Sequence, residues 1–103
     1  MTDDDREFAG DLAKLRRSID NLDAAMVHLF AERFRCTHVI GELKARHGLV
    51  SRDPRREAAQ LKRLRMLAAQ SGLDPEFTQK LHALIVREVI TNHEAVKFES
   101  GAG

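Results

Sequence analysis

The sequence predicts an all-α fold of three helices, one long and two shorter, and three observations lead to this prediction. Apolar residues recur at alternating spacings of three and four residues, as on the buried face of a helix. The pairs Asp53-Pro54 and Asp74-Pro75 each combine a good N-cap with a residue that suits the first helical position. No segment has the alternating pattern of a strand. With 103 residues, the chain corresponds to one small domain with a modest core.

The longest predicted helix covers residues 11–47, and Gly48 suits the position after its end. Gly41 is a poor helix former, but no proline interrupts the chain between residue 11 and Pro54. One face of this helix carries a continuous series that we call the seam. The seam consists of Leu12, Leu15, Ile19, Leu22, Met26, Leu29, Arg33, Cys36, Ile40 and Leu43.

The other two predicted helices are shorter. One covers residues 54–70 and ends before Ser71 and Gly72, and the other runs from Pro75 to about residue 98. The expected domain boundaries are a flexible N-terminal segment at 1–10, a helical domain at 11–98 and a frayed tail at 99–103.

The length of the first helix predicts an assembly. At 1.5 Å per residue it is roughly 50 Å long, whereas a compact domain of this size has a radius of gyration of about 13 Å. The two shorter helices can cover only part of the seam. A homodimer in which two long helices pack together removes the remaining apolar surface from water, and two-fold dimers are the commonest closed assemblies. We therefore expect a homodimer and no stable monomer.

Composition and charge exclude several classes of protein. Seventeen Lys and Arg against sixteen Asp and Glu give a formal charge of +1, so no overall field attracts nucleic acid or anionic lipid. No apolar run is long enough for a transmembrane helix, and the acidic start differs from a signal peptide. Cys36 is the single cysteine, which excludes an internal disulfide and a cysteine-based metal cluster. We expect a cytoplasmic protein.

Two cations lie on the face where apolar residues are expected. Taken alone, Arg33 is best explained by a stem that packs in the seam and a guanidinium that reaches solvent. Lys44 changes this interpretation, because eleven helical steps bring it to within about 20° of Arg33 and roughly 16 Å along the same face. Two long cationic side chains placed in this way can hold a small anion between them.

A second pair of cations, Arg55 and Arg56, directly follows Asp53-Pro54. Cations in the first turn of a helix are unfavourable by roughly 0.3–1 kcal/mol because of the helix dipole. A bound carboxylate would compensate Arg56, and the free N–H groups of the first turn favour the same anion. The alternative is that the two arginines pair with Asp53 and Glu57 on the surface, which contributes at most about 1 kcal/mol.

Five segments of the chain together carry a family resemblance. They are LRRSID (15–20), AER (31–33), IGELK (40–44), RDPRRE (52–57) and GLDPEF (72–77). Each segment alone is unspecific, whereas their order and spacing are specific and cover nearly the whole chain without gaps. In this arrangement the chain resembles the all-helical (AroQ-type) chorismate mutases, in the short monofunctional form common in high-GC bacteria.

The resemblance implies an enzyme that converts chorismate to prephenate, the branch step toward phenylalanine and tyrosine, by an intramolecular Claisen rearrangement. No cofactor or proton transfer is needed, but a dicarboxylate must be held in its compact conformer while negative charge grows on its ether oxygen. The resemblance also implies an intertwined homodimer of three-helix subunits. Some short members are activated by the first synthase of the shikimate pathway, which is therefore a further expected partner.

By position in the matching segments, Arg16 and Arg33 resemble the arginines that grip the substrate carboxylates, and Lys44 resembles the lysine that donates to the ether oxygen. Arg16 and Arg33 lie about 25 Å apart along one helix, too far to hold one small molecule. The resemblance implies that Arg16 completes the site of the partner subunit. Without the resemblance, Arg16 would be interpreted as a solvated residue.

Further site residues follow from the same segments. Asp53 and Glu57 match the carboxylates around the substrate's ring hydroxyl and Arg56 the arginine between them, although N-capping alone would explain Asp53. Val89 stands where well-known members have Ser, and His93 where they have Gln or Glu. Either His93 is a packed core residue, or its ring N–H is a second donor to the ether oxygen and its protonation makes turnover pH-dependent.

Other functions stay open at this point. Enzymes of the same fold act on related substrates, as isochorismate-pyruvate lyase and aminodeoxychorismate mutase do, and Glu57 would accept an amine as well as a hydroxyl. A non-catalytic helical interaction module would explain the seam, but not Arg33 and Lys44 on one face. No metal site is expected, because the other histidines lack the spacing of a zinc motif. These are His28, His38, His47 and His82.

Overall fold

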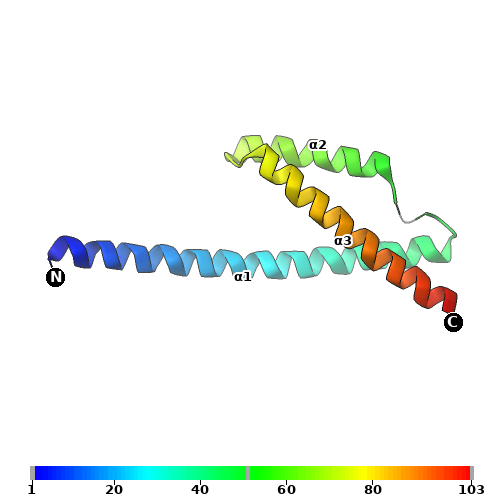
Figure 1. Cartoon of the computed structure of the whole chain (residues 1–103), viewed down its shortest axis with the longest axis horizontal. Helices are drawn as coiled ribbons and strands as arrows, with labels where there is room; N and C mark the ends of the chain where they lie inside the picture. Colours follow the sequence, from blue (N-terminus) through cyan, green and yellow to red (C-terminus); the bar gives the residue numbers. More distant parts are fainter. Residues whose placement is uncertain (1, 51, 103) are drawn as a thin grey trace. The chain divides into compact units, whose positions relative to one another are not determined.

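The structure, a computed structural model, describes the backbone of residues 2–50 and 52–102 and the side chains of residues 2–50 and 52–95. Figure 1 shows its helices, and the described residues contain no strand. This confirms the predicted all-α class. The helices are α1 (Asp3–Arg46), α2 (Pro54–Ser71) and α3 (Pro75–Ala102).

Helix α1 begins at Asp3, so the predicted start near residue 11 is wrong. The Thr2 hydroxyl accepts a hydrogen bond from the Asp5 N–H at 3.2 Å, and the Asp5 carboxylate accepts one from the Thr2 N–H at 3.3 Å. This reciprocal pair is a capping box, and the acidic first turn suits the positive end of the helix dipole. Helix α3 likewise continues beyond the predicted end near residue 98. The division of the chain into functional segments stays a prediction.

The ends of α1 and α2 follow the predicted glycines. Gly48 and Gly72 have positive φ angles of 67° and 75°, the left-handed region that glycine adopts without steric cost. After α1, the Leu49 N–H donates to the Lys44 carbonyl at 2.8 Å and the Gly48 N–H to the Ala45 carbonyl at 3.3 Å. This pair of bonds is a Schellman motif. The glycine positions therefore confirm both predicted helix ends.

The chain divides into two compact units, residues 1–35 and residues 36–103. The first unit is a single helical stretch, and its seam residues from Leu15 to Leu29 are 48% to 71% exposed. Within one copy of the chain these side chains do not form a core. Among the described residues, no helix is long and apolar enough to cross a membrane.

In the second unit, α2 and α3 form a helical hairpin (Figure 1). Arg65 of α2 holds the start of α3, because its Nη1 donates to Gln79 Oε1 at 2.7 Å and to the Pro75 carbonyl at 3.4 Å. Its Nη2 also donates to Glu76 Oε1 at 3.2 Å. We call these bonds the Arg65 clamp.

The core of the hairpin is small. Its buried apolar side chains include Ala68 and Ile85, and Thr78 and His82 are buried beside them. The Thr78 hydroxyl donates to the Asp74 carbonyl at 3.3 Å, and Nε2 of His82 lies 3.4 Å from Gln60 Oε1. Thr78 and His82 therefore each have a hydrogen-bond partner, as buried polar groups generally do.

Candidate active site

The start of α2 is built by Asp53, as the sequence predicts. Asp53 has extended backbone angles (φ −130°, ψ 92°), and its carboxylate accepts a hydrogen bond from the Arg56 N–H at 3.1 Å. Pro54 occupies the first position of the helix. Asp53 is therefore an N-cap, and its carboxylate provides an acceptor for one of the N–H groups of the first turn that have no partner within the helix.

Glu57 is paired with Arg52, the residue before the N-cap. Nε of Arg52 lies 3.1 Å from Oε1 of Glu57, and Nη2 lies 3.3 Å from Oε2, so the guanidinium holds both carboxylate oxygens. The side chain of Glu57 is only 22% exposed, against 63% for Arg52. Glu57 therefore pairs with Arg52, and not with Arg55 or Arg56 as the alternative in the sequence analysis has it.

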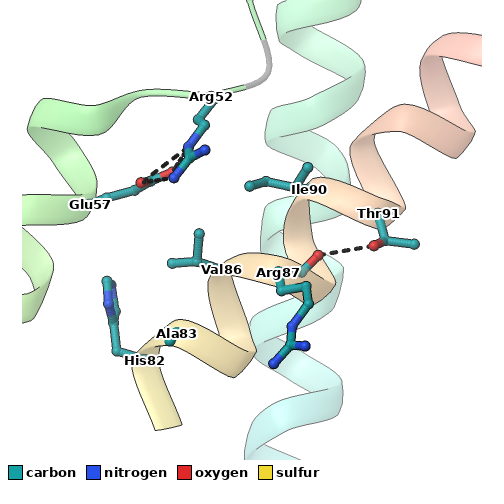
Figure 2. A pocket seen from close by; sticks show the side chains of 8 residues that line it. All are labelled: Arg52, Glu57, His82, Ala83, Val86, Arg87, Ile90 and Thr91. Carbon is teal, nitrogen blue, oxygen red and sulfur yellow. Dashed lines mark hydrogen bonds and ion pairs between the residues drawn. The ribbon is translucent and has the colours of Figure 1, made fainter. Parts of the chain in front are cut away.

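Arg52 and Glu57 border a cavity of about 410 Å³ in the second unit (Figure 2). This volume is in the range typical of small-molecule sites. Side chains of α3 supply an apolar wall, and the polar groups come from α3 and from the start of α2. The lining residues are Arg52, Glu57, His82, Ala83, Val86, Arg87, Ile90 and Thr91.

His93 is buried against α1. Its Nε2 lies 2.7 Å from the Thr37 carbonyl oxygen, which can only accept, so Nε2 carries the donated proton. The ring fits because residue 41 is glycine: a Cβ there would lie 2.5 Å from Cδ2 of His93. Nδ1 of His93 is also buried and has no hydrogen-bond partner among the described residues. The structure therefore has the packed, hydrogen-bonded histidine of the first alternative, whereas donation from the ring to the ether oxygen stays a prediction.

The other predicted site residues do not line this cavity, as far as the described side chains show. Lys44 and Val89 are half-buried, on α1 and α3. In the unit of residues 1–35, Arg16 is exposed and Arg33 is half-buried. Nη1 of Arg33 is enclosed without a hydrogen-bond partner among the described residues, which is costly for a charged group. A guanidinium in this state is suited to an anionic ligand.

Four polar residues of the cavity are absent from the sequence-based prediction of the site, namely Arg52, His82, Arg87 and Thr91. For Arg52 the sequence contains a signal, namely its position directly before the N-cap Asp53. Residues that flank an N-cap at the positions of Arg52 and Glu57 often pack together as a hydrophobic staple. Here an ion pair occupies that position. For His82 and Arg87 the sequence carries no comparable signal, because their place depends on how α3 packs on α2.

The arrangement can bind a small polar ligand. Glu57, when ionised, accepts hydrogen bonds only, and Val86 and Ile90 offer an apolar surface to a ring. Among the described residues, no group of three or more His, Cys, Asp and Glu is placed to hold a metal ion. The chemistry that these side chains support is hydrogen bonding to a hydroxyl or amine and electrostatic binding of an anion.

Comparisons with known proteins give the family. The model of the family described as chorismate mutase type II matches residues 15–94. The T-protein of Haemophilus influenzae is 31% identical over 93 residues, which are 90% of this chain and 25% of that protein. The chorismate mutase of Methanocaldococcus jannaschii is 29% identical over 75 residues, 73% of this chain and 76% of that enzyme.

A third relative is the bifunctional chorismate mutase/prephenate dehydratase of Buchnera aphidicola, 31% identical over 80 residues, or 78% of this chain and 21% of that protein. The chain therefore spans about a quarter of the length of the T-protein and less of the bifunctional protein. This chain therefore matches one region of each of these longer proteins.

Proposed function

Since the chain belongs to the chorismate mutase type II family, we propose that it catalyses the rearrangement of chorismate to prephenate. The observation that carries this proposal is the family match over residues 15–94, which includes every site residue that the sequence analysis assigns. These residues are Arg16, Arg33, Lys44, Asp53, Arg56, Glu57, Val89 and His93.

The proposed mechanism is electrostatic. Chorismate is a dicarboxylate, and its rearrangement requires a compact conformer that is rare in water. Arg33 and the partner subunit's Arg16 bind the two carboxylates and hold that conformer. Lys44 donates to the ether oxygen, where negative charge develops as the bond to carbon breaks. Because this charge is larger in the transition state than in the substrate, such a donor accelerates the reaction.

The start of α2 binds the ring hydroxyl in this proposal. Glu57 accepts its hydrogen bond, supported by the enclosed position of this carboxylate beside the cavity. Asp53 and Arg56 lie next to it, already joined by the N-cap bond at 3.1 Å. Val89, on the same helix as the apolar cavity wall, contributes a non-polar contact in place of a hydroxyl.

His93 is the proposed second donor to the ether oxygen. Its Nε2–H already donates to the Thr37 carbonyl at 2.7 Å, so the neutral ring has only a lone pair at Nδ1. With that bond kept, Nδ1 donates only when the ring is protonated. This form of the proposal requires the protonated histidine.

The proposal includes an intertwined homodimer. The exposed seam residues of α1 support it, because 48% to 71% exposure of Leu15, Ile19, Leu22, Met26 and Leu29 leaves a long apolar stripe in water. In a two-fold dimer, the seam of the second copy packs against the seam of the first and removes both from water. The proposed compartment is the cytoplasm, where the exposed thiol of Cys36 would stay reduced.

The test is a chorismate-to-prephenate assay on the wild type, on Arg33→Ala and on Arg35→Ala. Arg35 is a matched control, since it is an exposed arginine of the same helix that pairs with Glu32 at 2.6 Å. We expect Arg33→Ala to lower kcat/KM by about 100-fold or more, because a substrate carboxylate loses its cation. Arg35→Ala should stay within about threefold of the wild type.

Isochorismate and the amino analogue of chorismate are assayed beside chorismate, because enzymes of the same fold use them. The first synthase of the shikimate pathway is added in a parallel series, since the family resemblance implies activation by that enzyme. Retained helicity with equal turnover of chorismate by the wild type and Arg33→Ala would reject the proposed site.

A further inference from the structure

We infer that Arg52 determines which substituent the substrate ring carries: its pairing with Glu57 selects a neutral hydroxyl over a positively charged amine. This inference rests on the proposed function. It concerns a residue outside the set assigned from the family pattern, and it addresses the choice that Glu57 alone leaves open.

The side chains of Arg52 and Glu57 are held together by several hydrogen bonds. The guanidinium of Arg52 reaches both oxygens of Glu57, with N···O distances of 3.1 Å (Nε to Oε1), 3.4 Å (Nε to Oε2) and 3.3 Å (Nη2 to Oε2). Figure 2 shows the pair at the edge of the cavity, opposite Val86 and Ile90 of α3. A fork that holds both oxygens fixes the plane of the carboxylate as well as its position.

The pair differs from an ordinary surface ion pair in how much of the acid is enclosed. Arg35 and Glu32 on α1 also form an ion pair, but both nitrogens of Arg35 bond to the single oxygen Oε2, and both side chains are about two-thirds exposed, at 66% and 64%. Glu57 is 22% exposed. The two arginines are similarly exposed, at 63% and 66%, so the pairs differ in the acid. Charges are screened less where water is excluded, so a group bound beside Glu57 interacts with this pair more strongly than a group beside Glu32 interacts with the pair on α1.

The charge of the pair decides what it accepts. An ionised Glu57 alone would attract a protonated amine more strongly than a hydroxyl. With Arg52 bound, the pair has no net charge, yet the carboxylate keeps lone pairs beyond those that the fork occupies. A hydroxyl can donate to one of them at no electrostatic cost. An ammonium group at the same place is repelled by the guanidinium, which offsets its attraction to the carboxylate.

Arg87 does not duplicate this effect. It lines the same cavity from α3, but its guanidinium points away from Glu57 in Figure 2. Its carbonyl accepts a hydrogen bond from the Thr91 hydroxyl at 3.0 Å, a bond within α3. Of the two arginines that line the cavity, Arg52 is therefore the one that is paired with Glu57.

The experiment compares kcat/KM for chorismate with kcat/KM for the analogue that carries an amine in place of the ring hydroxyl. The variants are Arg52→Gln, which removes the charge, Arg52→Lys, which keeps it, and Arg35→Gln as the matched control. For Arg52→Gln we expect the ratio of the two kcat/KM values to shift toward the amine by about fivefold or more. Arg52→Lys should restore most of the wild-type ratio, and Arg35→Gln should leave it unchanged.

A purely structural role of Arg52 would lower both kcat/KM values together and leave their ratio constant. An unchanged ratio in Arg52→Gln, measured on protein with wild-type helicity, overturns the inference. Failure of the proposed function is a different result, since the wild type would then not convert chorismate at all.

Discussion

The two units of the chain use their apolar residues in opposite ways. In residues 1–35, a complete helical stretch exposes its seam to water, with Leu22 at 68% and Leu29 at 71%. In residues 36–103, α2 and α3 bury Ala68 and Ile85 between them, and the Arg65 clamp ties the two helices together.

The difference shows which part of the fold a single copy can stabilise. A hairpin with capped helices and a buried contact has tertiary interactions of its own. A lone helix in water is only marginally stable, and its stability in proteins comes mainly from packing of its apolar face. In the proposed homodimer, residues 1–35 therefore depend on the partner subunit more than residues 36–103 do.

The largest expected effect is a charge in the seam of the first unit. Leu22→Glu places a carboxylate in the middle of the proposed dimer interface, and two-fold symmetry places it there twice. Burial of unpaired charges is strongly unfavourable. We expect the dimer dissociation constant, measured by analytical ultracentrifugation, to rise by about 100-fold or more.

Met66→Glu is the control for this change. Met66 is 55% exposed on α2, so the substitution adds the same charge to an exposed apolar position of the second unit. Its effect on dimerisation should be small. If both variants dissociate to the same degree, or neither does, the seam is not the interface.

The next effect compares the glycines of the two units. Gly41→Ala places a Cβ 2.5 Å from Cδ2 of His93. The ring must then move, which weakens or breaks its hydrogen bond to the Thr37 carbonyl. Overpacking of this kind lowers the free energy of unfolding by about 1–3 kcal/mol. The higher helix propensity of alanine raises it by a smaller amount, so the variant is destabilised overall. Gly10→Ala meets nothing within 4 Å and should stabilise its helix by about 0.5–1 kcal/mol.

Chemical denaturation of both glycine variants measures these changes. Opposite signs are the expected outcome. A stabilised Gly41→Ala variant would mean that His93 does not lie against the backbone of α1.

A smaller effect is expected from the clamp of the second unit. Arg65→Ala removes the bonds to Gln79, Glu76 and the Pro75 carbonyl and should lower the free energy of unfolding by about 1 kcal/mol, because these groups are partly exposed. Arg63→Ala, an exposed arginine of the same helix, should change it by less than about 0.5 kcal/mol. Equal thermal midpoints of the two variants would show that the clamp does not stabilise the hairpin.

Features set by a few neighbouring residues could be predicted from the sequence. The Asp-Pro starts of α2 and α3 and the glycines after α1 and α2 depend on local caps, and the structure has them as predicted. The start of α1 was missed although Thr2 and Asp5 form a capping box. The prediction relied on apolar periodicity, which begins only at Leu12.

Features that depend on two packed helices could not be predicted. Gly41 was interpreted as a poor helix former, whereas it makes room for a ring that comes from α3. For His93 the sequence allows two roles, because only the contact with Thr37 shows which ring nitrogen is engaged. The ion pair of Arg52 with Glu57 could not be predicted, because it depends on how the loop before α2 places the Arg52 side chain. The proposed site residues themselves stay predictions.

The central claim is that one active site contains residues of two copies of the chain, and a mixing experiment tests it most directly. Arg16→Ala and Lys44→Ala should each be inactive alone, since each lacks a cation in every site. When the two are unfolded together and refolded in equal amounts, half of the dimers are mixed, and one of the two sites in each mixed dimer carries both native residues. We expect recovery of about a quarter of wild-type chorismate turnover. A mixture that forms mixed dimers but stays as inactive as its parents would contradict the shared site.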